Sequence, residues 1–260
     1  MKAKKSYGQH FLHREDIAEK IANSLQRTEA YERVLEVGPG RGMLTQYLLG
    51  RDYELLVVEA DRDMVHYLQK YYPQLGERLI AADFLRLPLE EVMGNGAFAL
   101  IGNFPYNISS QILFKMLEYR QQVPELVGMF QHEVAERVVA PPGSKAYGVI
   151  SVLVQAWYEG EYLFKVDKSA FQPPPKVQSG VIRLRRRPRT DLGCDEKLFR
   201  RIVKQTFGQR RKMLRNTLKS FVADHPMLQE DFFQQRPERL SVADFLQLTQ
   251  RIEAIIHRSS

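Results

Sequence analysis

The chain has 260 residues and a mass of 30.3 kDa, enough for one large domain or for a large domain with a small one. Hydrophobic residues make up 44% and charged residues 27%, which is typical of globular proteins and excludes collagen-like and wholly disordered classes. Cys194 is the single cysteine, so no intramolecular disulfide can form, and no Cys/His cluster has zinc-ligand spacing. We therefore expect no metal.

The basic N-terminal residues lack the apolar stretch of a signal peptide. No apolar run in the chain reaches the roughly 18 residues that cross a membrane. We therefore expect a cytoplasmic protein with no membrane partner.

Positive charge is concentrated towards the C-terminal end of the chain. Residues 1–180 carry 20 Lys/Arg against 22 Asp/Glu, whereas residues 181–260 carry 18 against 9. A solvated helical face is the simpler explanation of a charged segment. A basic part attached to a near-neutral part nevertheless favours a polyanionic partner, and nucleic acid is the leading candidate.

Short apolar, β-branched runs alternate with segments of helical spacing in the first half of the chain. This alternation predicts a doubly wound α/β sheet whose ligands bind beyond the carboxyl ends of parallel strands. The expected strands are residues 33–37, 54–59, 78–82 and 97–101. The expected helices carry Leu44, Leu48 and Leu49, then Met64, Val65 and Leu68, then Ile108, Ile112, Leu113, Met116 and Leu117.

Four more apolar runs predict strands: residues 126–130, 149–157, 164–167 and 181–187. The last ones lack long helices between them and predict an antiparallel edge. After Arg187 comes a turn-rich connection, and a helical lobe begins near Asp195, with Ser241 as the predicted N-cap of a final helix. The expected domains are residues 1–190 and residues 191–260.

A glycine-rich turn follows the first expected strand. Gly38 and Gly40 allow a ligand to approach the backbone closely. The dinucleotide fingerprint requires Gly or Ala where Met43 stands, and an apolar residue where Glu36 stands, which argues against NAD. A carboxylate here suits a cationic ligand such as S-adenosylmethionine, although a glycine turn alone is weak evidence for any one cofactor.

Acidic residues end the next two strands. Glu59 lies about 20 residues beyond the turn, where doubly wound folds place the acid that accepts ribose hydroxyls. Asp83, with Phe84 beside it, is suited to accept a hydrogen bond from a cofactor's adenine amine. Glu59 has an alternative role at a helix N-terminus, and Asp is also a common turn residue.

The fourth strand leads into Asn103-Phe104-Pro105-Tyr106. Hydrogen bonds from an adenine amine to the Asn103 side-chain oxygen and to a backbone carbonyl, for example that of Phe104, would localise the amine lone pair. Pro105 would fix the turn, and Tyr106 would stack on the base. As a bare pattern this tetrapeptide is more often a turn with a core tyrosine, but its position at a fourth strand end favours catalysis.

The ordered set of motifs resembles the rRNA adenine N6,N6-dimethyltransferases, and among them the KsgA or RsmA branch that modifies small-subunit rRNA. The motifs are YGQHFL at 7–12, EVGPGRG at 36–42, VVEADRD at 57–63, NFPYNISS at 103–110, QHEVAERV at 131–138, FQPPPKVQSGVIRL at 171–184 and RRKMLRNTLK at 210–219. The resemblance implies a Rossmann-like class I SAM-dependent methyltransferase core with a small all-helical C-terminal domain. It also implies dimethylation of two adjacent adenosines in the 3′-terminal hairpin of 16S rRNA.

The resemblance adds further site residues. His10 and Leu12 match positions that contact S-adenosylmethionine through the backbone, and Phe171 matches the aromatic residue opposite Tyr106 across a flipped base. Alone, Phe171 would be assigned to the core. His10, Phe104 and His132 stand where family members often have Asn, Leu and Lys, and we expect no catalytic histidine.

The expected RNA-binding surface comprises Arg185, Arg186, Arg187, Arg210, Arg211, Lys212 and Arg215. The alternation of Arg183 with Arg185 allows one of them to face into the fold. We expect a monomer that binds 16S rRNA in the small subunit or its precursor. Three alternatives remain: a macrolide-resistance dimethylase acting on large-subunit rRNA, a noncatalytic ribosome assembly factor and a DNA adenine methyltransferase.

Overall fold

The computed structural model describes residues 9–258. The chain divides into two compact units, of which the first holds residues up to 136 together with 159–186. The second unit holds residues 137–158 together with those from 187 onwards. It therefore includes a segment, 137–158, that the sequence analysis assigns to the first domain.

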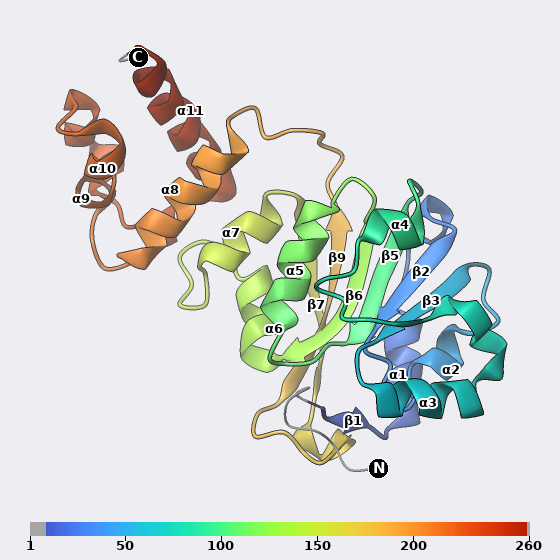
Figure 1. The fold of residues 1–260 in the computed structure, drawn as a ribbon. Coiled ribbons are helices and arrows are strands. Elements are labelled where there is room, and N and C mark those ends of the chain that lie inside the picture. Colours follow the sequence, from blue (N-terminus) through green and yellow to red (C-terminus); the bar gives the residue numbers. More distant parts are fainter. Residues whose placement is uncertain (1–8, 259–260) are drawn as a thin grey trace. The chain divides into compact units, whose positions relative to one another are not determined.

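Within the described residues, a seven-stranded sheet runs through the first unit in the order β4-β3-β2-β5-β6-β9-β7 (Figure 1). Adjacent strands from β4 to β6 pair in parallel, and β9 pairs antiparallel to β6. The strands are β2 (Arg33–Val37), β3 (Glu54–Glu59), β4 (Leu79–Ala81), β5 (Phe98–Asn103), β6 (Glu125–Gln131), β7 (Tyr158–Val166) and β9 (Ser179–Arg186). The predicted α/β sheet with an antiparallel edge is confirmed.

Helices precede the first strand of the sheet and alternate with the strands of its parallel part, and a 3₁₀ helix follows β7. They are α1 (Glu15–Ala22), α2 (Thr45–Leu48), α3 (Arg62–Tyr71), α4 (Leu89–Met93), α5 (Ser109–Glu118) and α6 (His132–Val139), with the 3₁₀ helices η2 (Thr28–Ala30), η3 (Pro73–Arg78) and η4 (Lys168–Ala170). A separate two-stranded sheet pairs β1 (Phe11–Leu12) antiparallel with β8 (Phe171–Gln172).

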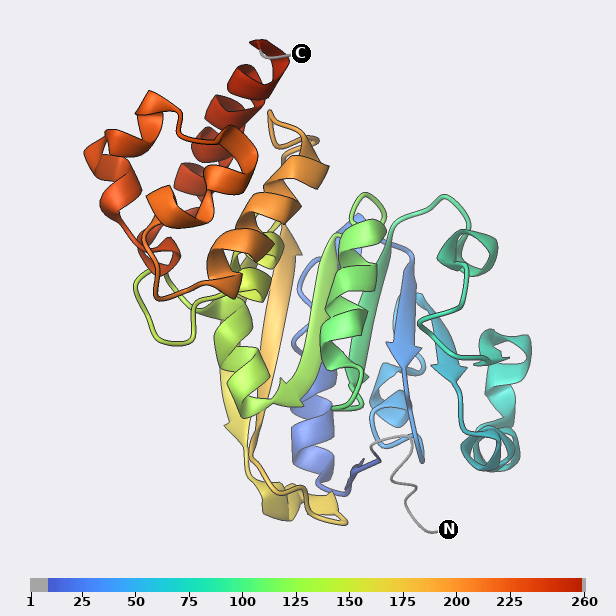
Figure 2. The ribbon, with the colours of Figure 1, turned by 60° about the vertical axis from the view of Figure 1, so that its left-hand side comes forward.

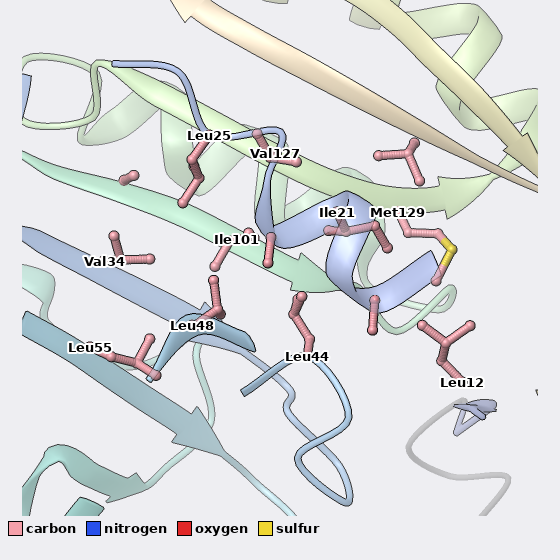
Figure 3. Close-up of a cluster of buried hydrophobic side chains, with 14 of the residues drawn as sticks. Leu12, Ile21, Leu25, Val34, Leu44, Leu48, Leu55, Ile101, Val127 and Met129 are labelled. Carbon is pink, nitrogen blue, oxygen red and sulfur yellow. The ribbon is translucent and has the colours of Figure 1, made fainter. Parts of the chain in front are cut away.

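Both faces of the seven-stranded sheet are covered. Side chains alternate between the faces along a strand, and the set that includes Val34, Ile101 and Val127 packs with residues of α1 and α2 (Figure 3). On the other face lies α5, in front of the strands in Figures 1 and 2, with Ile112 and Met116 buried. The near-continuous apolar runs of the strands are explained by this double coverage.

Apart from Tyr158, the first residue of β7, the regular structure described for the second unit is helical. Its elements are α7 (Val149–Gln155), α8 (Glu196–Gly208), α9 (Leu214–Thr217), α10 (Lys219–Val222), α11 (Val242–Arg258), η5 (Pro226–Gln229), η6 (Asp231–Gln234) and η7 (Pro237–Arg239). Asp195 caps α8 by accepting the Leu198 N–H at 2.6 Å. Ser241 caps α11 as predicted, since its hydroxyl accepts the Asp244 N–H at 3.1 Å.

Residues 149–157 do not form the predicted strand: residues 149–155 are α7. The helix begins after Gly148, whose N–H donates to the Ser151 hydroxyl at 2.9 Å, and that hydroxyl donates to the Arg137 carbonyl at 2.5 Å. The five residues from Ile150 to Val154 are all buried. A short segment that is buried on every side has no polar face, so its apolar run cannot distinguish a helix from a strand.

Candidate active site

A cavity of about 580 Å³ lies at the carboxyl ends of the parallel strands in the first unit. Its lining includes every residue predicted to bind the cofactor and the whole 103–106 motif. These residues are His10, Leu12, Glu36, Gly38, Gly40, Glu59, Asp83, Phe84, Asn103, Phe104, Pro105 and Tyr106. Segments far apart in the sequence therefore meet around one space, at the edge of the sheet where the α/β pattern predicts a ligand.

The glycine turn needs its glycines for both conformation and space. Gly38 and Gly42 have φ values of 70° and 78°, which side chains rarely adopt. A Cβ on Gly42 would also meet the Tyr72 ring at 2.4 Å. The Tyr72 hydroxyl donates to the Gly42 carbonyl at 3.0 Å, so this ring supports the turn from outside.

Glu36 is almost completely buried, although it belongs to the cavity lining. It is 1% exposed, and its carboxylate accepts a hydrogen bond from the Thr45 hydroxyl at 2.7 Å. Burial raises the pKa of Glu36 to about 8. The neutral form is therefore favoured near pH 7 in the free protein, and the predicted role of Glu36 towards the cofactor stays a prediction.

Glu59 ends β3 with its carboxylate fixed by backbone groups. One oxygen accepts the Gly40 N–H at 3.2 Å and the other accepts the Asp61 N–H at 2.9 Å. Burial raises the pKa of Glu59. Since an ionised carboxylate has about four acceptor positions, two remain after these bonds for a ligand that donates hydrogen bonds.

Asp83 follows β4 in a tight turn. One carboxylate oxygen accepts the Leu85 N–H at 2.9 Å, while the Asp83 carbonyl accepts the N–H groups of Arg86 and Leu87, each at 3.0 Å. Phe84 is buried beside it. Asp83 is therefore a turn residue, as the alternative interpretation predicted, and it also lines the cavity.

Asn103 ends β5 with its amide held on one side only. Its Nδ2 donates to the His10 carbonyl at 3.2 Å. The side-chain oxygen accepts no hydrogen bond from the described residues. This places an oriented, unused acceptor in the cavity lining.

The rest of the 103–106 motif is packed into the protein. Phe104 is buried with its ring 5.0 Å from that of Phe130. The Tyr106 hydroxyl forms a hydrogen bond with the hydroxyl of Ser179, a fully buried residue on β9, and its ring lies 5.3 Å from the His10 imidazole. Burial raises the pKa of Tyr106, which keeps the hydroxyl protonated. The Ser179 hydroxyl therefore fixes one edge of the ring, and the ring forms part of the cavity lining.

An N-terminal segment closes one side of the cavity. Gln9 donates to the Asp61 carboxylate at 2.8 Å, and the His10 imidazole Nδ1 lies 2.9 Å from the Pro173 carbonyl. Since a carbonyl can only accept, His10 Nδ1 carries the hydrogen. The pairing of β1 with β8 continues this link, so the segment is fixed to the loop after residue 170.

Phe171 does not line the cavity. It is 2% exposed and packs in the core cluster with Leu12, its partner across the β1/β8 pair. The structure therefore does not bring it face to face with Tyr106. Its stacking role stays a prediction, and it requires the side chain to leave this packing.

The predicted RNA-binding residues fall into two classes. The guanidinium groups of three of them donate hydrogen bonds within their own unit. Arg186 donates to the carbonyls of Arg120 and Gln121, and Arg187 donates to the Gln155 carbonyl. Arg210 donates to the Glu238 carboxylate and to the Ser144 carbonyl. Within residues 9–258, Arg185, Arg211, Lys212 and Arg215 have no such partner. Arg183 faces into the fold as the alternation allowed, bound to Glu161 at 2.6 Å.

Some residues of the site were not singled out from the sequence. Gln9 and Ser179 lie within quoted motifs, but only their contacts with Asp61 and Tyr106 reveal them. Tyr7 and Gly8 of the first motif lie outside the described residues. Residues 9–258 contain no group of three or more potential metal ligands. In this same part of the chain, no helix is long and apolar enough to cross a membrane.

A family model described as ribosomal RNA adenine dimethylase matches residues 1–253. The chain belongs to this family. The family predicted from the motifs is confirmed, and with it the predicted class of enzyme, an rRNA methyltransferase.

Curated relatives match along nearly their whole length. The ribosomal RNA small subunit methyltransferase A of Flavobacterium johnsoniae is 52% identical over 254 residues, which cover 98% of this chain and 97% of the relative. The protein of the same name from Bacteroides thetaiotaomicron is 51% identical over 254 residues, 97% of this chain and 95% of the relative.

Solved structures show the same fold. A dimethyladenosine transferase from Plasmodium falciparum has a TM-score of 0.80 at 24% identity, covering 94% of this chain and 98% of that one. The 23S rRNA methyltransferase ErmE has a TM-score of 0.66 at 24% identity, covering 92% and 99%. The expected Rossmann-like methyltransferase core with a helical C-terminal region is confirmed.

Proposed function

We propose that this protein transfers methyl groups from S-adenosylmethionine to the N6 amines of two adjacent adenosines in the 3′-terminal hairpin of 16S rRNA, as a step in ribosome biogenesis. The choice of the small subunit is supported by the names of the relatives that match over nearly the whole chain. The observation that carries the reaction is the unused side-chain oxygen of Asn103 in the lining of a cavity that also contains Glu59 and Asp83.

The residues around the cavity fit S-adenosylmethionine, which supplies a methyl group on a positively charged sulfur. Glu59 has two acceptor positions left for the ribose hydroxyls. Asp83 offers a carboxylate to the adenine amine, with the Phe84 ring beside it. Gly38 and Gly40 let the methionine part lie against the backbone, and the Gln9–Leu12 segment, with His10 and Leu12, closes the site.

Asn103 prepares the target amine. Its Nδ2 is held by the His10 carbonyl, so its oxygen has a fixed direction before the substrate arrives. Accepting an N–H from the amine localises the nitrogen lone pair, and the hydrogen bond strengthens as the nitrogen becomes positive. The backbone carbonyl of Phe104 is the proposed second acceptor.

Tyr106 receives the base. Pro105 and the buried Phe104 fix the turn that carries it, and the Ser179 hydroxyl holds the edge of the ring. The face of the ring stacks on an adenine flipped out of the hairpin and aligns the amine with the methyl group. Phe171 is the proposed partner on the second face of the base.

The two units divide the work. The first unit binds the cofactor and performs the transfer, and the second unit contributes the basic surface for the RNA backbone. Its support is the exposed pair Arg211 and Lys212, which have no partner among residues 9–258. We propose a cytoplasmic monomer, because ribosomal subunits are in the cytoplasm and one cavity serves one adenine at a time.

The deciding experiment offers methyl-labelled S-adenosylmethionine with three substrates: unmethylated small subunits, large subunits and adenine-containing DNA. We expect label only in the small subunit, on two adjacent adenosines that map to the 3′-terminal hairpin. Glu59→Ala is the control for cofactor dependence. Label in the large subunit or DNA would assign a different substrate, and no label on any of them would support a noncatalytic role.

A further inference from the structure

Lys115 is a buried cation that the proposed reaction does not use. It lies on α5, is 7% exposed, and has the buried residues Ile112 and Met116 on the same helix. No carboxylate of residues 9–258 lies within ion-pair distance of it. Burial lowers the pKa of its ammonium group, as expected for a charge removed from water.

The ammonium group binds the turn that follows β4. It donates to the Phe84 carbonyl at 2.6 Å and to the Leu87 carbonyl. It also lies 5.1 Å from the centre of the Phe84 ring and 5.9 Å from that of Tyr119. Hydrogen bonds from a charged donor are stronger than neutral ones, so both carbonyls are firmly held.

This turn carries three residues of the cavity lining, Asp83, Phe84 and Leu85. Its own hydrogen bonds, from the N–H groups of Leu85, Arg86 and Leu87 to Asp83, fix its local shape. They do not connect it to the rest of the fold. The buried Phe84 ring provides one connection, and the Ala82 N–H, just before the turn, provides another by donating to the Glu59 carbonyl at 3.0 Å. Lys115 adds a third, because its hydrogen bonds join the turn to the ten-residue helix α5.

A purely structural role explains Lys115 poorly. A leucine or methionine on α5 would fill the same place without the cost of burying a charge. The lysine instead supplies donors to two carbonyls at the edge of the cavity. Its helix also begins at Ser109, shortly after Tyr106, so one rigid element carries Lys115 and follows the 103–106 motif.

We propose that Lys115 is a positioning residue for the cofactor: by holding the Phe84 and Leu87 carbonyls, it keeps Asp83 and Phe84 in place to receive the adenine end. This inference rests on the proposed function, in which Asp83 and Phe84 bind that adenine. Lys115 does not touch the cofactor. It reduces the share of molecules in which the turn has the wrong shape for binding.

The test compares cofactor affinity in Lys115→Met and in Lys70→Met, where Lys70 is an exposed lysine on α3. If the freed turn has its binding shape in about one molecule in ten, the dissociation constant rises about tenfold in Lys115→Met. It should be unchanged in Lys70→Met. Calorimetry with S-adenosylhomocysteine measures both, and the turnover number of Lys115→Met at saturating S-adenosylmethionine should stay near that of the parent.

Two further measurements separate positioning from folding. Hydrogen exchange at the Leu85 to Leu87 amides should be faster in Lys115→Met, while exchange in the sheet is unchanged. In a double-mutant cycle, Asp83→Ala and Lys115→Met should be less than additive, since both act on the same contact. Lys115→Arg, which keeps charge and donors, should restore affinity to within about threefold of the parent.

Parent-like affinity in a folded Lys115→Met protein, or full additivity with Asp83→Ala, would overturn the inference. If Lys115→Met does not fold, Lys115→Gln takes its place with the same expected loss, because its amide is too short to reach both carbonyls. A parent protein that binds no S-adenosylhomocysteine would contradict the proposed function instead, so the two failures are distinguishable.

Discussion

The polar side chains around the cavity of the first unit have hydrogen-bond partners in the protein. The basic side chains of the second unit that are predicted to bind RNA differ in this respect. Around the cavity, Glu59 and Asn103 are each fixed by a neighbouring backbone group. In the second unit, Arg211 and Lys212 are exposed and have no partner among the described residues. Both regions are rich in polar groups, but only those of the first are oriented by hydrogen bonds within the described residues.

This contrast follows from what each region has to do. Transition-state stabilisation requires groups that are already oriented, because reorientation during the reaction costs free energy. Phosphate binding draws instead on charge that can adjust to a backbone, with counterion release as a driving force. Arg210 shows the difference within one sequence motif, since its bonds to Glu238 and Ser144 make it part of the fold.

The largest effect is expected at Asn103. Replacing it with Ala removes one oriented acceptor, and such losses reduce turnover by about 10² to 10³. Binding of the small subunit should barely change. Single-turnover methylation at saturating cofactor measures the rate, with Asn23→Ala, a surface amide outside the cavity, as the control. A folded Asn103→Ala protein that methylates at the parent rate would remove the 103–106 motif from the mechanism.

A smaller effect is expected at Glu36, through stability. Its folded pKa of about 8 lies above the ordinary value of 4.5, so the folded state binds the proton more tightly than the unfolded state. The resulting stability is complete below about pH 4.5 and is lost as the pH rises towards 8. The parent should lose on the order of 3 to 4 kcal/mol of stability between pH 5 and pH 8 through this group, and Glu36→Gln should abolish that pH dependence.

Urea unfolding at a series of pH values measures this difference. The control is Glu54→Gln, which alters an exposed glutamate at the start of β3 and should leave the pH dependence unchanged. Equal pH dependence in the parent and in Glu36→Gln would show that Glu36 is ionised in the folded protein at pH 7. Glu36 would then become a preformed partner for a cationic ligand.

The smallest effect is expected on RNA binding, from changes at Arg211 and Lys212. Reversing Arg211 and Lys212 to Glu should flatten the log–log salt dependence of RNA binding by about one unit per lost phosphate contact. The free energy of unfolding should be unaffected. Arg210→Met should do the opposite, with a stability loss of up to about 1 kcal/mol and an unchanged salt dependence.

Binding titrations at several salt concentrations test this prediction. Lys20 and Lys70 in the first unit, both reversed to Glu, give the same change in net charge as the control. If the control pair flattens the salt dependence as much as the test pair, net charge alone governs binding and the assigned surface is wrong.

Much of the fold could be predicted because strands and their ends have strong local signals. The runs at 33–37 and 54–59 match the strands residue for residue. Glu59, Asp83 and Asn103 were found because parallel strands bring their carboxyl ends to one edge. The run at 149–157 could not be assigned in the same way, since complete burial of α7 removes the polar face that reveals a helix.

The hydrogen-bond and packing partners of individual side chains could not be predicted from the sequence either. Arg186 and Arg211 are alike in sequence, and only the fold shows that the first binds carbonyls while the second has no partner in the part of the chain that the structure describes. The same holds for Phe171, whose burial beside Leu12 depends on a pairing across the length of the first unit. Lys115 gave no signal at all, because nothing local relates a helix position to a turn 28 residues earlier.

The β1/β8 pair also has a consequence for how the protein is made. Leu12 and Phe171 are neighbours in this pair, although most of the first unit lies between them in the sequence. The His10 imidazole likewise forms a hydrogen bond with the Pro173 carbonyl. During synthesis the glycine turn, Glu59, Asp83 and Asn103 all emerge long before residue 173. Their strands can assemble early, but the wall that covers them is completed only when a late segment returns to the start of the chain. The nascent protein can thus form the parallel strands from β2 to β6 before its binding site is closed.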